Sequence, residues 1–474
     1  MDNDESDGST GGPFFFGEIG FVDKLKQVPL ATLAGLIPHY LAFYLFGSPL
    51  WTETIAEWIM ARTPSAYAVT ILQILGPWAK PFAMTGALAL LGFAVMVSLQ
   101  VRWIGPLICA AGLGWAFGYA SWLGQLSFWS GVLLFSFKPV PHLAGRREFM
   151  AVGVAAVALE SYMRNAALGH RAVEPVALFP FHAPVENFAA GLVRKAVTPI
   201  PEFYGMSKNT VDPAVDPRTW RLKITADGRT LQEIGYSELL ALPRVERYAT
   251  LRCISNTLQS DLMGTAQWSG LFLSRLINRS KLPANIVEAA VLGMDGHGDS
   301  FAMDYAFSDE LLLALGMNGK TLDRTHGFPI RLIAPRYYGF KSVKWIAEIA
   351  FVSRPYFGTW PKLGYTKEPA VHTASHFDRV LSGPGGLRAG GVSFAGIRGI
   401  ERVQVRADGG PWVNATLEQP LSPYSWTRWF VKLPVNSAGQ VEARALDRTG
   451  RWQDSVPGPL FPNGVTGPTV RSIV

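Results

Sequence analysis

The sequence predicts a protein of several domains: an amino-terminal region of transmembrane α-helices, a middle domain of mixed α and β structure, and a carboxyl-terminal β-sandwich. Three observations support this fold class. The 474 residues are 49% hydrophobic, which is high for a soluble enzyme. Long apolar runs dominate up to about residue 165, and charges, prolines and turn residues recur after it. Beyond about residue 385, apolar and polar residues alternate between turn signals.

The first part of the chain predicts a membrane anchor. Residues 1–27, which begin "MDNDESDGSTGG", predict a flexible cytoplasmic tail. Residues 28–168 predict about five spans, because each apolar run approaches the ~20 residues that cross a bilayer. The runs lie at about 28–47, 81–101, 103–119, 122–138 and 149–165. Basic residues flank alternate spans, at Lys24, Lys26, Arg102, Lys138, Arg146 and Arg147. The positive-inside rule then places the protein in the cell membrane, with the later domains on the periplasmic or extracellular side.

Other charges and the cysteines narrow the class of protein. The pair Arg146-Arg147 is followed by an aromatic residue and an apolar stretch, so it is either a twin-arginine export signal or an ordinary basic loop. The net charge is +7, but the basic residues are scattered, which disfavours nucleic-acid binding. Two cysteines, Cys109 and Cys253, cannot form a disulfide framework.

The remaining residues divide into three parts. Residues 169–218 are Pro-rich and predict a linker that wraps onto the folded domain after it. Residues 219–372 predict mixed structure: a strand in "TWRLKITADG", a short helix in "YSELLALPRVE", and two strands around a glycine turn in "PIRLIAPRYYGFKSVKWIAEIAFV". Residues 373–474 predict a β-sandwich, with strands in "IERVQVRADGGPWVNATLEQ" and "GQVEARALDRTGRWQD".

Cys253 is the candidate for chemistry, and its residue type alone leaves four interpretations open. A thiolate is a soft ligand for a transition metal, and Arg252 beside it would lower its pKa. An isolated cysteine is otherwise an inert buried thiol. A nucleophile needs an adjacent base, and no cysteine-hydrolase signature is present. A zinc site needs several ligands at regular spacing, and the sequence holds no CxxC or HExxH.

The stretch "LRCISN", "LMGTAQWSGLFLSRLI" and "LALGMNGKTLDRTHGFPIRLIAPRYYGFKSVKWIAEI" resembles the molybdopterin-binding domain of the sulfite oxidase family. The resemblance runs from about Phe203 to the carboxyl terminus, and the membrane spans resemble the anchored bacterial branch. The carboxyl-terminal sandwich resembles the immunoglobulin-like dimerisation domain of that family, which implies a homodimer.

The resemblance implies a molybdenum–molybdopterin cofactor with Cys253 as the protein thiolate on the metal. It implies that Arg331 and Lys344 hold the pterin phosphate, that His326 bonds the pterin or its phosphate arm, and that Ser342 and Val343 approach the cofactor through their backbone. Tyr365 corresponds to the active-site tyrosine of the family. The expected cofactor-binding set is completed by Tyr204, Gly205, Ser207, Asn209 and Ser255.

This sequence departs from sulfite oxidases near the cysteine. It has Ser255-Asn256-Thr257 and Gln267 where sulfite oxidases carry arginines. Because a dianion needs localised positive charge, sulfite becomes one candidate among several. We expect a membrane-anchored enzyme that performs two-electron oxygen-atom transfer on a small substrate. The alternative on the same fold is a reductase of sulfoxides of the methionine sulfoxide type. The alternative of another class is a non-catalytic binding or structural module in which Cys253 ligates nothing.

Electrons must enter or leave such a site. Haem b ligation by two histidines is disfavoured, because His39 is the only histidine within a clear span. We therefore expect the spans to serve as an anchor or quinone-side docking surface, with a separate cytochrome or quinone-linked protein as redox partner.

Overall fold

The computed structural model describes residues 174–208, 212–383, 386–435 and 438–473, together with scattered residues between 31 and 132. The predicted tail and, apart from those scattered residues, the predicted spans lie outside the described residues. Among the residues described, no helix has both the length and the apolar character needed to span a bilayer. The chain divides into two compact units, and all of the structure below belongs to the second, which comprises Arg62–Ala79 and His170–Val474.

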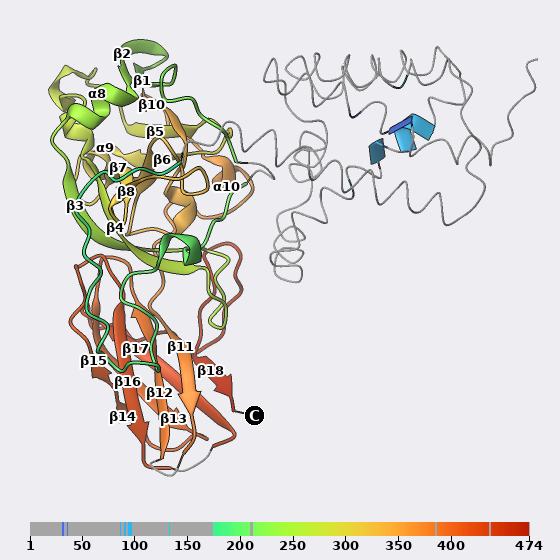
Figure 1. The fold of residues 1–474 in the computed structure, drawn as a ribbon, viewed down its shortest axis with the longest axis vertical. Coiled ribbons are helices and arrows are strands. Elements are labelled where there is room, and N and C mark those ends of the chain that lie inside the picture. Colours follow the sequence, from blue (N-terminus) through green and yellow to red (C-terminus); the bar gives the residue numbers. More distant parts are fainter. Residues whose placement is uncertain are drawn as a thin grey trace, which may run out of the picture. The chain divides into compact units, whose positions relative to one another are not determined.

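The middle of the chain forms two β-sheets with short helices around them (Figure 1). The first sheet has the order β2-β1-β10-β5-β6, from β1 (Arg221–Ala226), β2 (Arg229–Gly235), β5 (Glu288–Gly293), β6 (Gly298–Ala302) and β10 (Ile346–Val352). The pair β1–β10 is parallel and its other pairs are antiparallel. The hairpin β1–β2 turns at Asp227 and Gly228, which have φ of 43° and 81°, as a two-residue hairpin loop requires.

The second sheet carries the residues that lead to the site. Its strands are β3 (Val245–Arg252), β4 (Met263–Leu271), β7 (Leu312–Met317), β8 (Lys320–Thr321) and β9 (Arg331–Ile333). The order is β3-β4-β7-β8, and β9 pairs with β7. The β3–β4 register pairs Arg252 with Met263 at the end of the ladder. Every side chain of β7 is buried, which explains why "LLALGM" is a continuous apolar run.

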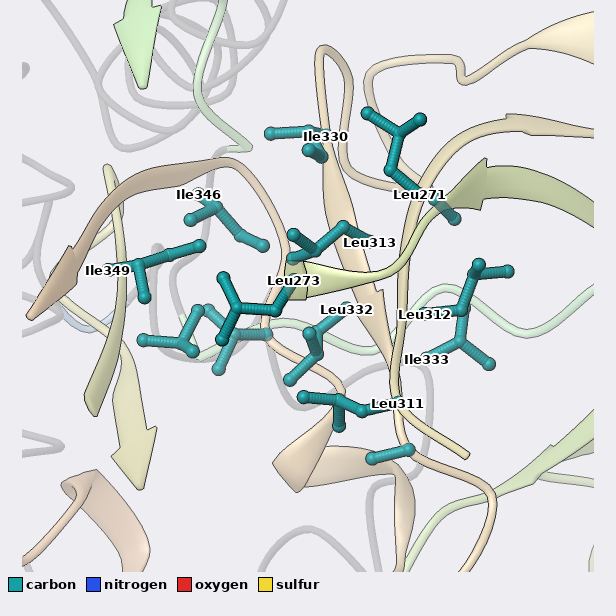
Figure 2. Close-up of a cluster of buried hydrophobic side chains, with 14 of the residues drawn as sticks. Leu271, Leu273, Leu311, Leu312, Leu313, Ile330, Leu332, Ile333, Ile346 and Ile349 are labelled. Carbon is teal, nitrogen blue, oxygen red and sulfur yellow. The ribbon is translucent and has the colours of Figure 1, made fainter. Parts of the chain in front are cut away.

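A single apolar core joins the two sheets. Figure 2 shows Leu271, Leu312 and Leu313 of the second sheet gathered in one cluster with Ile346 and Ile349 of β10. All five side chains are less than 2% exposed. Burial of this kind contributes roughly 25 cal/mol per Å² of apolar surface, so the sheets hold each other in place.

Short helices and 3₁₀ turns connect the strands. The α-helices are α8 (Tyr236–Ala241), α9 (Met303–Ala306) and α10 (Thr359–Lys362), and the 3₁₀ turns are η3 (Ile200–Glu202), η4 (Leu273–Arg275), η5 (Arg279–Lys281) and η6 (Gly339–Lys341). The predicted strand at β1, helix at α8 and strands at β9 and β10 are confirmed. The glycine turn expected between the last two is the 3₁₀ turn η6.

The carboxyl-terminal region consists of two antiparallel sheets of four strands each. One sheet has the order β11 (Ala374–Leu381), β12 (Leu387–Phe394), β16 (Thr427–Leu433) and β15 (Thr416–Leu417). The other sheet has the order β14 (Val413–Asn414), β13 (Ile400–Ala407), β17 (Gln440–Asp447) and β18 (Thr469–Ser472). Side chains of both sheets, among them Trp429 and Val403, form its core. The strands predicted at β13 and β17 are confirmed, and the immunoglobulin-like assignment stays a prediction.

The segment before the first sheet lies along both of these regions. Residues 174–208 contain one 3₁₀ turn, η3, and otherwise lack helix and strand. The Leu178 amide donates to the carbonyl of Gly319, beside β8, at 2.8 Å. The side chain of Arg194 contacts Asp261, between β3 and β4, and Asp378 on β11, each at 2.5 Å.

A buried ion pair supports the turn η6. Lys341 is 1% exposed, and its Nζ donates to Asp299 Oδ1 at 2.8 Å, to the Ser300 carbonyl at 2.6 Å and to the Lys367 carbonyl at 3.0 Å. All three hydrogens of the ammonium therefore have acceptors. The pair connects β6 to the loop that contains Ser342, Val343 and Lys344.

Removing the cation of this pair should destabilise the fold, because Asp299 would remain buried without its partner. We expect Lys341→Met to lower the free energy of unfolding by about 3–5 kcal/mol. Thermal and guanidinium unfolding of the full chain measure the change. Lys320→Met, at an exposed lysine, is the matched control and should change it by no more than about 0.5 kcal/mol. Equal effects of the two substitutions would contradict the prediction.

Candidate active site

Cys253 lies one residue beyond the end of β3 and continues its ladder. Its amide donates to the Leu262 carbonyl at 2.9 Å, and its carbonyl accepts from the Asn256 amide at 3.1 Å. The Asn256 side chain closes the loop from within, because its Oδ1 accepts from Ser260 Oγ at 2.7 Å and from the Leu262 amide at 3.0 Å. These bonds fix the backbone on both sides of the thiol.

The surroundings of the thiol act on its pKa in opposite directions. Burial raises the pKa of Cys253, whereas hydrogen bonds from the backbone and side chain of Ser255, the charge of Arg252 and the amide of Ile254 lower it, and the net shift is upward. Without a metal the sulfur therefore keeps its proton at neutral pH. A metal ligand must lose that proton, and the groups that lower the pKa are placed to stabilise the thiolate then formed.

Arg252 lies beneath this loop and is fully buried. Its Nη1 donates to the His372 carbonyl at 3.1 Å, its Nη2 donates to the Asn256 carbonyl at 3.4 Å, and the guanidinium lies 5.7 Å from the centre of the Tyr338 ring. Burial lowers its pKa, and among the described residues its Nε has no partner. Arg252 thus supports the backbone of the cysteine loop with a charge that is kept from solvent.

Two tyrosines lie within electrostatic reach of the thiol. Burial raises the pKa of Tyr204, the charge of Cys253 raises it further, and Arg331 lowers it. The charges of Cys253 and Arg331 therefore both act on the Tyr204 hydroxyl. Burial and then Cys253 raise the pKa of Tyr365 to about 12, so this hydroxyl keeps its proton at neutral pH and can donate a hydrogen bond.

A glycine makes room for the first of these tyrosines. A Cβ at Gly339 would lie 2.5 Å from the hydroxyl oxygen of Tyr204 and 3.3 Å from the carbonyl oxygen of Arg252. Any side chain at this position would therefore displace Tyr204 from its place near the cysteine loop.

Arg331 and Lys344 form a cationic pair around Gly327. This glycine has φ of 104°, and a Cβ built on it would lie 3.0 Å from the Cβ atoms of both Arg331 and Lys344. Arg331 Nη1 donates to the His326 carbonyl at 3.2 Å, and Nη2 donates to the Ser342 carbonyl at 3.4 Å. Lys344 Nζ donates to the Thr325 carbonyl at 2.8 Å and lies 4.1 Å from the Trp345 ring centre.

Arg331 has capacity for an anion. It is 6% exposed, it stacks 5.1 Å from the centre of the Trp268 ring, and burial lowers its pKa to about 10, which still leaves it charged at neutral pH. Its Nε has no hydrogen-bond partner among the described residues, and no carboxylate of those residues lies within 4.0 Å of it. A phosphate oxygen would satisfy such a donor, so the residues fit the phosphate end of a pterin cofactor.

His326 is bonded within the protein. Its backbone amide and its Nδ1 both lie 2.7 Å from Asp323 Oδ1, and its Nε2 lies 3.3 Å from the Phe203 carbonyl oxygen. Burial acts against ionisation of Asp323, yet the hydrogen bonds and charge of His326, with the charge of Lys344, hold its pKa below the ordinary value. The expected contact of His326 with the pterin stays a prediction, since both ring nitrogens have protein partners here.

The other predicted cofactor residues are placed as follows. Ser342 Oγ accepts from the Ala334 amide at 3.1 Å, and the Val343 carbonyl accepts from the Leu332 amide at 2.8 Å. Ser207 Oγ donates to Asp212 Oδ1 at 2.7 Å. Gly205 is exposed, and a Cβ on it would lie 2.5 Å from Thr325 Cγ2. Asn209 lies outside the described residues.

Three further residues belong to the site and were not singled out from the sequence: Gly327, Asp323 and Trp268; Gly339 was expected only as the turn before Ser342. The glycines carried a signal, because each precedes an aromatic residue in a loop beside the predicted cations. Asp323 and Trp268 carried none, since a carboxylate in a loop and an aromatic residue in a strand are ordinary in any domain.

Comparison with known proteins finds similarity to molybdopterin-binding oxidoreductases. Residues 209–360 match the oxidoreductase molybdopterin-binding domain family. Sulfite oxidase of Gallus gallus is 27% identical over 337 residues, which cover 60% of this chain and 73% of that protein. The catalytic subunit of the protein-methionine-sulfoxide reductase of Burkholderia mallei is 31% identical over 181 residues, which cover 34% of this chain and 53% of that protein.

Among solved structures, the chain is similar to the sulfane dehydrogenase of Paracoccus pantotrophus. The TM-score is 0.46 and the identity 22%, with 52% of this chain and 72% of that one covered.

The Asp323–His326 contact should make stability depend on acid pH. The folded-state pKa of Asp323 is lower than its ordinary value, so the stabilisation is complete above about pH 4 and is lost as the pH falls through the folded-state pKa. We therefore expect the difference in melting temperature between the wild type and Asp323→Asn to be largest near neutral pH and to shrink below about pH 4.

Melting curves at several pH values measure this difference. Asp304→Asn, at an exposed carboxylate paired with Arg279, is the control and should give a small difference at each pH. A difference for Asp323→Asn that stays constant from neutral to acid pH would contradict the assignment.

Proposed function

Because this chain is a molybdopterin-binding oxidoreductase of the sulfite oxidase family, we propose that it catalyses two-electron oxygen-atom transfer on a small substrate, with Cys253 as the protein ligand of molybdenum. Its cofactor is molybdenum–molybdopterin. The observation that carries the proposal is a buried thiol fixed at the end of β3, together with a buried arginine, Arg331, that has a donor without a partner among the described residues. The charges of both groups act on the Tyr204 hydroxyl. A soft ligand and an anion-binding group in one domain suit a metal-bearing pterin that ends in a phosphate.

The roles of the residues follow from their chemistry. When bound, the cofactor supplies the oxygen-atom and two-electron chemistry. Cys253 would hold the metal as a thiolate, and the Ser255 groups would stabilise the sulfur by hydrogen bonds. Arg331 and Lys344 would hold the phosphate. Tyr365 would donate a hydrogen bond to the substrate oxygen, because its raised pKa keeps it protonated.

Among oxygen-atom transfers, we propose reduction of a sulfoxide as a second candidate beside oxidation of sulfite. In this reaction R₂SO, two protons and two electrons give R₂S and water, whereas sulfite oxidation consumes water and releases two protons and two electrons. The charge near the thiol favours the neutral substrate, because Arg252 is fully buried beneath Tyr338 and its guanidinium is kept from solvent. The Gln267 side chain is bonded to a carboxylate, because its Nε2 donates to Glu246 at 3.3 Å.

The aromatic residues around Tyr365 also suit an apolar sulfoxide. Its ring centre lies 6.2 Å from that of Phe340 and 5.7 Å from that of Trp360. The likeness to a methionine-sulfoxide reductase subunit supports the same candidate. Sulfite, a small dianion, would gain little from contact with these aromatic rings.

The proposal predicts that Cys253→Ser abolishes turnover while the protein remains folded. Full-length protein from cells that make the cofactor would be assayed with a reduced dye against sulfoxides and N-oxides, and with an oxidising dye against sulfite. Metal analysis should find about one molybdenum per chain in the wild type. Ser274→Ala, at an exposed serine of η4, is the control and should keep the wild-type rate. Wild-type protein without molybdenum, or an unchanged rate in Cys253→Ser, would favour a non-catalytic module.

We propose further that residues 28–168 anchor the enzyme in the cell membrane with residues 174–473 outside the cytoplasm, served by a separate cytochrome or quinone-linked partner. The apolar runs and flanking basic residues support this placement. Protease added to intact spheroplasts should then remove the carboxyl-terminal epitope of the chain, while a cytoplasmic marker survives. Protection of the epitope until lysis would contradict it. The homodimer also stays a proposal, and light scattering of the detergent-solubilised protein tests it.

A further inference from the structure

The segment Leu460–Gly464 leaves the carboxyl-terminal sheets and packs beside Tyr365. It lies between β17 and β18 in the chain. Leu460 is buried in the same apolar cluster as Tyr365 and Ile254, the residue that follows Cys253. The Gly464 amide donates to the Leu460 carbonyl at 2.6 Å and closes the segment into a turn. A loop of the carboxyl-terminal region therefore reaches the neighbourhood of the cysteine.

Phe461 makes the closest ring contact of this segment with Tyr365. The ring centres lie 5.0 Å apart at an interplanar angle of 80°, the edge-to-face arrangement that aromatic pairs prefer. Phe340 and Trp360 contact the same tyrosine ring at larger centre distances. With three aromatic neighbours, the Tyr365 ring has little freedom to change rotamer.

The residues on either side of Tyr365 are held by the same segment. Gly364 has φ of 96°, and a Cβ on it would lie 3.0 Å from Phe461 Cζ, so the phenyl ring fills the space of a side chain there. The Thr366 amide donates to the Pro462 carbonyl at 3.4 Å, and Thr366 Oγ1 donates to Asn463 Oδ1. The backbone that presents Tyr365 is thus fixed from the carboxyl-terminal region.

The other end of the turn reaches the residues that cover Arg252. A Cβ on Gly464 would lie 2.6 Å from the hydroxyl oxygen of Tyr338, and this oxygen accepts from the His372 amide at 3.3 Å. Tyr338 and His372 both contact the buried guanidinium of Arg252. The turn therefore packs against both the tyrosine and the support of the cysteine loop.

We propose that Phe461 is a positioning residue, supplied by the carboxyl-terminal region, that holds the Tyr365 hydroxyl in place for the reaction. This rests on the proposed function, in which Tyr365 donates a hydrogen bond to the substrate oxygen. Phe461 acts through the tyrosine and does not itself touch the reacting atoms. The carboxyl-terminal region then forms part of the catalytic unit.

A double-mutant cycle on the molybdenum-loaded full chain tests the proposal. Phe461→Leu should lower kcat/KM by about tenfold or more, because displacement of a catalytic group by about 1 Å costs up to ~100-fold. In a Tyr365→Phe background, which lacks the hydroxyl, the same substitution should change kcat/KM by less than about twofold. An equal loss in both backgrounds, or no loss in either, would overturn the proposal.

The carboxyl-terminal region provides a matched control. Phe377 on β11 contacts Trp429 edge-to-face at 5.5 Å and is partly buried, as Phe461 is. Phe377→Leu removes a ring of the same kind from the same region and should leave kcat/KM unchanged in both backgrounds. A loss in Phe377→Leu that matches that of Phe461→Leu would show a general effect of weakened packing and would also overturn the proposal.

A second measurement needs no turnover. In full-length protein carrying 3-fluorotyrosine at its 14 tyrosines, the fluorine NMR line of Tyr365 is the one missing from Tyr365→Phe. Phe461→Leu should shift this line and increase its relaxation by a soluble gadolinium chelate, whereas Phe377→Leu should not. An unchanged line overturns the proposal. If no substrate is turned over but the line responds, the proposed function fails and the positioning role stands.

Discussion

The hydrogen bond from the Cys253 amide to the Leu262 carbonyl determines where the thiol lies, and the site is arranged around it. This bond adds one more rung to the ladder in which Arg252 and Met263 are paired. The sulfur therefore takes its position from a strand buried in the second sheet. Asn256 closes the loop that follows, so no flexible segment stands between the core and the cysteine.

Arg252, Arg331 and Lys341 are buried cations of this domain, and their partners distinguish their roles. Lys341 has a carboxylate and two carbonyls for its three hydrogens, as a purely structural charge requires. Arg252 and Arg331 donate to carbonyls, and among the described residues each keeps an Nε without a partner. An uncompensated guanidinium in a dry interior is costly unless something else binds it. Arg331, which shares Gly327 with Lys344, is the one placed for an anionic ligand.

Local patterns in the sequence predicted local structure, and the resemblance to a family predicted the chemistry. Alternation ending in Asp227-Gly228 predicted β1 and its turn, and the same kind of pattern predicted β13 and β17. Cys253 taken alone left four interpretations open. The contact of Phe461 with Tyr365 joins residues far apart in the chain, so no periodicity indicates it. The bond of His326 to Asp323 was not predicted, because a histidine three residues after an aspartate does not indicate any particular contact.

The contacts of Arg194 limit how far the amino-terminal side of the chain can be shortened without loss of folded structure. Its guanidinium contacts Asp261 in the cysteine loop and Asp378 on β11, and its amide donates to Asp378 at 2.8 Å. A fragment that began at the first strand of the catalytic domain would lack this brace and also Tyr204. Any shortened version made for crystallisation should therefore start upstream of Glu186, whose carboxylate accepts from the Ala196 amide at 2.9 Å. The segment that contains Glu186 and Arg194 is therefore part of the folded structure and cannot be treated as a dispensable tether.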